Sequence, residues 1–275
     1  HGLTRFGIGL FKKVLIADLL AQISARVQFY EEPSVLAAWI GALAFTFEIY
    51  FDFSGYSDMA IGLSEVFGFE TPENFLHPYE SLSVSEFWRR WHVTLGAWFR
   101  EYIYIPLGGN RRGTARTIWN LFVVWLLTGF WHGASWNFVL WGLYYGILIM
   151  LEKFPLKNFW GRLPKGICWV YAFLAEVLGW VLFSHTDLVR AVGALGAMFG
   201  GAPRIDSLGL YLLSTAWPLL LISAVFCTEF PHRLFLKMCR SVPGKILWSA
   251  GFAALLLLSL SAMAGNGFTT FLYAK

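Results

Sequence analysis

Long apolar stretches separated by short charged segments recur along this chain, and they limit its fold more than any single motif does. Residues 166–184, 208–229 and 246–264 are each close to the ~20 apolar residues that a helix needs to cross a bilayer. Only 14% of the residues are charged and 57% are hydrophobic, whereas about a quarter are charged in a typical soluble domain. The chain is therefore predicted to be an all-α, polytopic membrane protein embedded in a lipid bilayer.

The basic residues gather in a few connecting segments, such as those around Arg111, Lys157 and Arg233. Connecting loops rich in Lys and Arg tend to face the cytoplasm, so these segments predict the orientation of the helices. The net charge of +4 therefore reflects loops that orient the helices in the membrane, and we infer no nucleic-acid partner.

Neither a disulfide nor a metal site is expected. The cysteines Cys168, Cys227 and Cys239 lie far apart in or beside apolar segments and form no CxxC pair, which favours inert packing residues. No HxxxH, HxxE or Cys/His cluster has the spacing of metal ligands.

The N-terminal third carries charges within its apolar runs. Arg5, Lys12 and Lys13 interrupt the first 30 residues, which favours an amphipathic helix lying in the membrane interface. Residues 35–69 are predicted to form a helical hairpin with a polar tip near Gly55, buried against other helices. Because His1 stands where an initiator Met would and no signal peptide precedes the first helix, residues 1–275 are expected to be one helical domain without its upstream part.

Residues 83 onward are predicted to form one long helix. Ser83 and Glu86 have the spacing of a capping box at its start, and Pro106 closes it. On a helical wheel the aromatic residues fill one arc and Arg89 and Arg90 the other. His92 falls at the boundary between the two arcs, where a histidine caps or snorkels as readily as it acts on a substrate.

The segment GFWHGASWNF places His132 at the end of an apolar run. Residues 117–131 number only 15, or ~22 Å of helix against a hydrocarbon core of ~30 Å. Because 136–151 return to a second basic loop, we expect the turn at 132–135 to lie deep in the membrane, facing protein or water.

An ionisable side chain at that depth is a functional candidate. Burial disfavours the imidazolium, so neutral His132 could accept a proton from a hydroxyl nucleophile. Hydrogen bonding of His132 to a helix end or an indole is an equally open interpretation.

Other polar residues of the apolar segments have two interpretations each. Asn137 could orient a substrate carbonyl or cap its helix, and Asp52 with Asp58 could form an acid pair around Gly55 or satisfy nearby amides and cations. Asp52 and Trp131 are also candidates for binding substrate. The remaining histidines of loops and segment ends are expected to be incidental. They are His77, His185 and His232.

Long blocks of the chain resemble the membrane-bound O-acyltransferase family, and in particular its bacterial branch that O-acetylates exported polysaccharides. The blocks are FDFSGYSDMAIGLSEVFGF, SEFWRRWHVTLGAWFREYIYIPLGGNRRG and NLFVVWLLTGFWHGASWNFVLWGLYYG, within a resemblance over about residues 5–200. The resemblance implies a ring of transmembrane and re-entrant helices, present here in part. This sequence departs from the family pattern at Ser184, where family members usually have Arg.

The resemblance also implies site residues and partners. It makes His132 the essential histidine and His92 the second motif histidine, with Trp131 and Asn137 in the surrounding block. It implies no bound cofactor, an acyl donor such as acetyl-CoA as co-substrate, a bacterial cytoplasmic membrane, an exported polysaccharide and an extracytoplasmic SGNH-hydrolase-like transferase. Arg89 and Arg90 would attract the donor's phosphates, although both could simply determine topology.

Two other functions stay open. The teichoic acid D-alanyltransferases share the histidine motif, so D-alanyl transfer is an alternative within the same class of enzyme. A non-enzymatic polysaccharide exporter or flippase would also need polar groups inside the membrane and basic loops, but the paired half-repeats typical of transporters are not found in this sequence.

Overall fold

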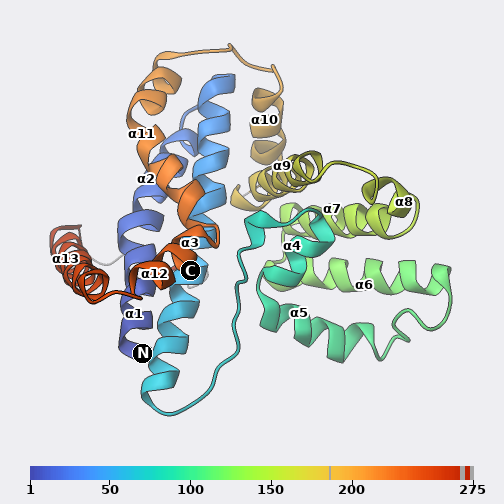
Figure 1. Ribbon diagram of the computed structural model, residues 1–275. Coiled ribbons are helices and arrows are strands. Elements are labelled where there is room, and N and C mark those ends of the chain that lie inside the picture. The colour runs from blue at the N-terminus through green and yellow to red at the C-terminus, as the bar shows by residue number, and fades with distance from the viewer. Residues whose placement is uncertain (186, 267–269, 273–275) are drawn as a thin grey trace.

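Helices form nearly all of the regular structure in the computed structural model, which describes residues 1–185, 187–266 and 270–272 (Figure 1). Four helices are long and apolar enough to cross a membrane. They are α3 (Val35–Val66), α9 (Lys165–Ser184), α11 (Ser207–Phe226) and α13 (Val242–Asn266). The all-α membrane class predicted from the apolar stretches is confirmed.

The helices form two groups that meet at α9 (Figure 1). The first group packs around α3. It contains α1 (Gly2–Phe11), the π-helical segment η1 (Lys12–Ala17), α2 (Asp18–Gln28), α10 (Leu188–Met198) and α11. The second group holds the two sequence blocks that contain His92 and His132. It contains α4 (Val84–Arg90), α5 (Val93–Phe99), the π-helical segment η3 (Arg100–Tyr104), α6 (Thr114–His132), α7 (Trp136–Lys153) and α8 (Lys157–Trp160).

Two smaller elements complete the described chain. The 3-10 turn η2 (Pro78–Glu80) precedes α4, and α12 (Phe230–Met238) connects α11 to α13. Helix α13 packs against α1 and η1 at the outer side of the first group.

The first 28 residues run antiparallel to α3 and pack along it, so the expected interfacial helix is wrong. A Cβ atom added at Gly9 would lie 2.5 Å from the carbonyl oxygen of Gly55, so both helices need small residues at this crossing. Close backbone approach at small residues is the usual packing of helices within membranes. The charges that suggested an interfacial position instead face α3, where acidic residues neutralise them.

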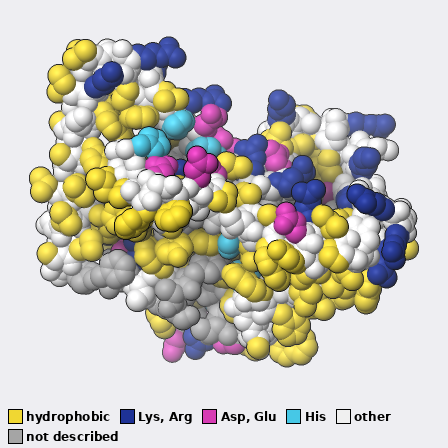
Figure 2. Space-filling view, turned by 90° about the horizontal axis from the view of Figure 1, so that it is seen from below, with side chains coloured by type: hydrophobic (Ala, Val, Ile, Leu, Met, Phe, Trp, Pro, Cys, Tyr) yellow, Lys and Arg dark blue, Asp and Glu magenta, His cyan; other side chains and the backbone are white. Residues whose placement is uncertain are grey.

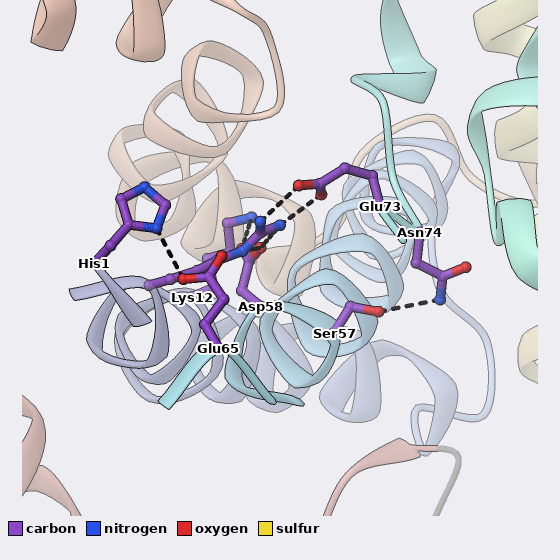
Figure 3. A network of polar contacts seen from close by, with 8 residues as sticks. His1, Lys12, Ser57, Asp58, Glu65, Glu73 and Asn74 are labelled. Atoms are coloured by element: carbon purple, nitrogen blue, oxygen red, sulfur yellow. Dashed lines mark hydrogen bonds and ion pairs between the residues drawn. The ribbon is translucent and has the colours of Figure 1, made fainter. Parts of the chain in front are cut away.

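Helix α3 is one continuous helix of 32 residues, so the expected hairpin with a tip near Gly55 is also wrong. The acidic residues that suggested a turn form ion pairs with cationic side chains of the neighbouring N-terminal helices. Asp52 lies 2.7 Å from Lys13 Nζ, and Asp58 pairs with both Lys12 and Arg5 (Figure 3). A helix can carry carboxylates through its middle when a neighbouring helix supplies the cations.

The predicted long helix from residue 83 is broken. Ser83 does cap its start by accepting a hydrogen bond from the Glu86 backbone N–H at 3.0 Å. Trp91 then adopts an extended conformation and His92 a left-handed one, with φ of 45°. The loop before η2 causes this break, because Phe75 forms an isolated antiparallel bridge with Trp91.

Helices α6 and α7 form the expected hairpin around residues 133–135. Helix α6 begins at Thr114 and has 19 residues, so it is ~28 Å long and close to the thickness of the hydrocarbon core. However, α6 is not among the four helices that are long and apolar enough to cross a membrane. The expectation that α6 does not complete the crossing and the depth of His132 in the membrane both stay predictions. The hairpin is tight, since a Cβ atom at Gly142 would lie 2.4 Å from the carbonyl oxygen of Trp125.

The junction of the two groups is an aromatic core. Trp91, Trp141, Tyr145 and Trp180 are among the largest fully buried side chains, and the rings of Trp91 and Trp180 lie 4.8 Å apart. These residues come from the α4–α5 break, α7 and α9. Their packing fixes the positions of the break and the hairpin relative to each other, and both candidate histidines lie on these two features.

Candidate active site

His132 ends α6 inside a set of aromatic rings. The centroid of its imidazole lies 4.9 Å from that of Trp131, 4.9 Å from that of Trp141 and 5.1 Å from that of Phe183. Rings on several sides remove the imidazole from most polar surroundings and restrict its rotation. Such a setting suits a neutral imidazole that exchanges a proton with a bound group.

His92 lies at the break between α4 and α5 and is brought close to His132. Its ring packs edge-on against Phe53 of α3 at 4.7 Å and lies 6.1 Å from the ring of Trp131. Trp131 is therefore a ring neighbour of both histidines. Residues separated by 40 positions in the sequence thus share one tryptophan.

A cavity of about 660 Å³ opens beside His92. This volume is within the range of small-molecule sites, which is about 300–1,000 Å³. Trp88, Trp91 and Trp125 give it an apolar wall, and Arg89, Arg100 and Lys153 give it cationic groups. His92 belongs to the lining residues and His132 does not, so His92 is the histidine that a molecule in this cavity would meet.

Glu152 also lines the cavity, but its carboxylate is used within the fold. Its two oxygens accept hydrogen bonds from the backbone N–H groups of Val84, at 2.7 Å, and Ser85, at 2.8 Å. These are unsatisfied donors of the first turn of α4, which a carboxylate stabilises well. Glu152 of α7 thereby holds the start of the helix that carries Trp88 and Arg89.

Two other predicted site residues, Asn137 and Arg90, do not line the cavity. Asn137 donates to the carbonyl oxygen of His185 at 2.8 Å and accepts from the Ser135 hydroxyl, which ties the α6–α7 turn to the end of α9. Arg90 pairs with Glu86 at 2.6 Å and is absent from the cavity lining. Asn137 thus joins the turn to α9, and Arg90 pairs within its own helix. The roles of both residues in binding stay predictions.

Asp52 is buried in an ion pair and does not belong to the lining residues of this cavity. Its carboxylate contacts Lys13 and accepts a hydrogen bond from the Leu272 backbone N–H at 2.8 Å. Asp58 pairs with different cations, so the two aspartates do not form an acid pair around Gly55.

Sequence reasoning missed Asn74, which contacts His92. The Nδ1 atom of His92 lies 3.2 Å from the Asn74 Oδ1 atom. Asn74 stands in the Pro-containing loop TPENFLHP, where an asparagine is ordinary. Only the folding of that loop against the α4–α5 break gives it a place at the site.

Cationic side chains surround the outer end of the second group. Figure 2 shows Lys and Arg gathered over the part of the molecule where α5 to α8 lie in Figure 1, and Arg111, Arg112, Arg116 and Lys157 are exposed there. Among the described residues, no group of three His, Cys, Asp or Glu side chains is arranged to hold a metal ion. Cys168, Cys227 and Cys239 are free thiols.

These features define a polytopic helical membrane protein with a paired-histidine site beside a cavity. The model of the family described as MBOAT, membrane-bound O-acyltransferase family, matches residues 1–186, and the chain belongs to this family. The matched region contains both histidines, the cavity and the N-terminal helices.

Several curated relatives are similar to the same region. A probable alginate O-acetylase AlgI of Pseudomonas fluorescens is 48% identical over 199 residues, which are 72% of this chain and 40% of that protein. The peptidoglycan O-acetyltransferase of Helicobacter pylori is 44% identical over 204 residues, 72% of this chain and 38% of that protein. A teichoic acid D-alanyltransferase of Streptococcus thermophilus is 29% identical over 158 residues, 54% of this chain and 37% of that protein. The chain thus spans about two fifths of the length of these relatives.

Proposed function

We propose that this chain carries the catalytic centre of a membrane O-acyltransferase that moves an acetyl group from a cytoplasmic donor across the bacterial cytoplasmic membrane, for O-acetylation of an exported polysaccharide. The observation that carries the proposal is the meeting of His132 and His92 at the ring of Trp131, beside a cavity with cationic lining groups. Family membership and the names of the O-acetylase relatives support it.

In this proposal His132 is the general base. Its neutral imidazole accepts the proton of an acceptor hydroxyl while that oxygen attacks the thioester carbonyl of the donor. The new carbon–oxygen bond forms, the carbon–sulfur bond breaks, and the leaving thiolate takes the proton from His132. No charge is then left in the aromatic surroundings at the end of the transfer.

His92 positions one of the reacting groups, because it lines the cavity and contacts the same tryptophan as His132. The structure gives Asn137 two partners within the fold, so His92 is the better candidate for this role. The cavity would hold the acyl donor, with Arg89, Arg100 and Lys153 near the phosphates of a donor such as acetyl-CoA.

The acceptor side of the reaction completes the proposal. The acetyl group would pass to the exported polysaccharide through an extracytoplasmic SGNH-hydrolase-like transferase. The AlgI relatives are named for alginate, so a uronate polysaccharide is the first acceptor to test.

The test replaces His132 by Ala in the full protein within the cell that makes it. We expect alkali-labile acetate to disappear from the exported polymer while the amount of membrane protein stays the same. His232→Ala is the matched control, because His232 is exposed on α12 and distant in sequence from the matched region. Acetate that persists in the His132→Ala strain would rule out the general-base assignment.

D-alanyl transfer to teichoic acid is the second candidate, supported by the similarity to D-alanyltransferases over 54% of the chain. The same strains decide between the candidates, because the ester that disappears in His132→Ala is either acetate or D-alanine. Loss of polymer export in place of loss of an ester would instead indicate an exporter.

A further inference from the structure

Asn74 joins three parts of the molecule that are far apart in the sequence. It is buried, follows Glu73 in the loop after α3, and its side chain contacts Ser57 of α3 (Figure 3). The same side chain also contacts His92 and Thr94 at the α4–α5 break. The loop is anchored beside it, because Glu73 accepts hydrogen bonds from Arg5 at 2.6 and 2.5 Å.

The contacts of Asn74 fix which end of its amide faces His92. The backbone N–H of Thr94 lies 3.2 Å from the Oδ1 atom, and a backbone N–H can only donate. The atom at this position must therefore be the amide oxygen. The opposite Nδ2 atom then donates to the Ser57 hydroxyl at 3.0 Å, so both ends of the amide are satisfied in this orientation. In the reversed orientation the amide nitrogen, itself a donor, would face the Thr94 N–H.

A fixed oxygen determines the proton on the imidazole. The Nδ1 atom of His92 lies 3.2 Å from the Oδ1 atom of Asn74, and an oxygen acceptor requires a donor opposite it. In a neutral imidazole one nitrogen donates and the other accepts. We propose that Asn74 is a positioning residue that holds His92 as its Nδ1–H tautomer, which leaves the Nε2 lone pair as the acceptor that His92 offers to a bound substrate.

The backbone of the same loop supports this arrangement. Val93 N–H donates to the Asn74 carbonyl oxygen at 3.1 Å, and Leu76 N–H donates to the Arg90 carbonyl oxygen at 2.9 Å. His92 itself has a φ of 45°, a conformation that is unfavourable for a non-glycine residue and persists only where its surroundings impose it. Asn74 thus imposes both the backbone position and the tautomer of His92.

The inference rests on the proposed function for its meaning, because an Nε2 acceptor lining the cavity would orient the hydroxyl or thiol of a reacting group. It predicts a specific property of the protein without substrate, however. The tautomer of His92 is measurable whether or not the chain is active, so failure of this inference and failure of the proposed function give different results.

The experiment is nitrogen-15 and carbon-13 NMR of histidine-labelled protein in lipid, with the His92 signals assigned by their absence in His92→Gln. Ring nitrogen and Cδ2 shifts distinguish the two neutral tautomers. We expect His92 in the wild-type protein to be protonated on Nδ1. A wild-type signal showing the proton on Nε2 would overturn the proposal without any further variant.

Three variants test the cause. Asn74→Asp keeps an oxygen toward His92, and the Ser57 hydroxyl can turn to donate to it, so the Nδ1–H tautomer should persist. Thr94→Val removes the hydroxyl that lies 3.0 Å from Asn74 Oδ1 and 3.4 Å from His92 Nδ1, but keeps the Thr94 backbone donor and the shape of the side chain. It leaves Asn74 Oδ1 as the oxygen opposite His92 Nδ1, so it is the matched control and should also keep the tautomer. Asn74→Leu removes the acceptor and should shift His92 toward the Nε2–H form.

Activity gives a second readout. In Asn74→Leu the turnover number should fall about 100-fold, within the range that a positioned acid–base group contributes, with a smaller change in the KM of the donor, and Asn74→Asp should restore most of it. An Asn74→Leu protein that loses activity while His92 keeps its Nδ1 proton would show a purely structural role and overturn the proposal. If Asn74→Leu does not fold, the wild-type and Asn74→Asp tautomers still decide it.

Discussion

The buried ion pair of Lys13 and Asp52 leads to a prediction that tests whether the Asp52 carboxylate stabilises the fold or binds substrate. The two side chains have relative exposures of 3% and 2%, and Lys13 Nζ lies 2.7 Å from Asp52 Oδ1 and 2.8 Å from Asp18 Oδ1. Asp52→Leu would leave the Lys13 ammonium buried with Asp18 as its remaining carboxylate.

Removal of one partner from a buried ion pair typically costs about 3–5 kcal/mol, because the other charge stays buried without compensation. Asp18 retains part of the compensation here, so we expect the lower end of that range, about 3 kcal/mol. For a chain of this size each kcal/mol lowers the unfolding midpoint by about 2–4 °C. The expected fall in Tm is therefore about 6–12 °C.

The assay is thermal unfolding of the purified protein in detergent, followed by tryptophan fluorescence at a fixed heating rate. The double variant Lys13→Met with Asp52→Leu removes both charges and should recover most of the lost Tm, because apolar side chains of similar volume can replace a buried pair. Glu229→Gln is the control for loss of an ion pair, since its partner Arg233 is exposed on α12 and exposed pairs contribute little.

The reasoning would be refuted by Asp52→Leu protein with an unchanged Tm and no acyl transfer. That result would return Asp52 to the substrate-binding role considered from the sequence. A double variant as unstable as the single one would show that Asp52 contributes through its hydrogen bond with Leu272 rather than through its charge.

Three further predictions follow from single contacts. Arg89→Ala should raise the KM of the acyl donor several-fold in a transfer assay, because Arg89 lines the cavity. Arg90→Ala, which removes a residue paired with Glu86, should leave this KM unchanged. Equal effects of the two variants would refute the placement of the donor. Gly142→Val should lower Tm because its Cβ would meet the Trp125 carbonyl oxygen at 2.4 Å, while Gly251→Val, where a Cβ meets open space, should not. Burial alone would raise the pKa of Asp206, but hydrogen bonds from Gly209 and Ser34 lower that pKa below its usual value. The stability that Asp206 contributes is therefore present above about pH 4 and is lost as the pH falls further. Tm measured against pH should show this loss, and Asp206→Asn should remove the pH dependence.

Several elements could be predicted from the sequence because their signal is local. The apolar stretches 166–184 and 208–229 correspond closely to α9 and α11. The cap at Ser83 and the turn after His132 are also where the pattern put them, since caps and turns depend on neighbouring residues.

Two errors concern polar residues whose partners come from distant segments, and the break after α4 likewise depends on a distant residue, Phe75. Taken alone, the charges of the first 28 residues indicate a membrane interface, and the acids of α3 indicate a turn. Together, the pairing of Lys13 with Asp52 and of Lys12 with Asp58 lets two helices run side by side. Neither pairing has a sequence signal, because it joins residues 39 and 46 positions apart.

The sequence by itself determined the class of protein, the three apolar spans that became α9, α11 and α13, and the two histidines. Hydropathy over ~20 residues and the identity of an ionisable side chain are local properties. The tertiary structure alone decided what those histidines contact. A shared ring of Trp131, an aromatic enclosure around His132 and an amide oxygen opposite His92 Nδ1 depend on loops and helices that meet only after folding. The chemistry of an imidazole is set by these neighbours, so the site becomes defined only at that level.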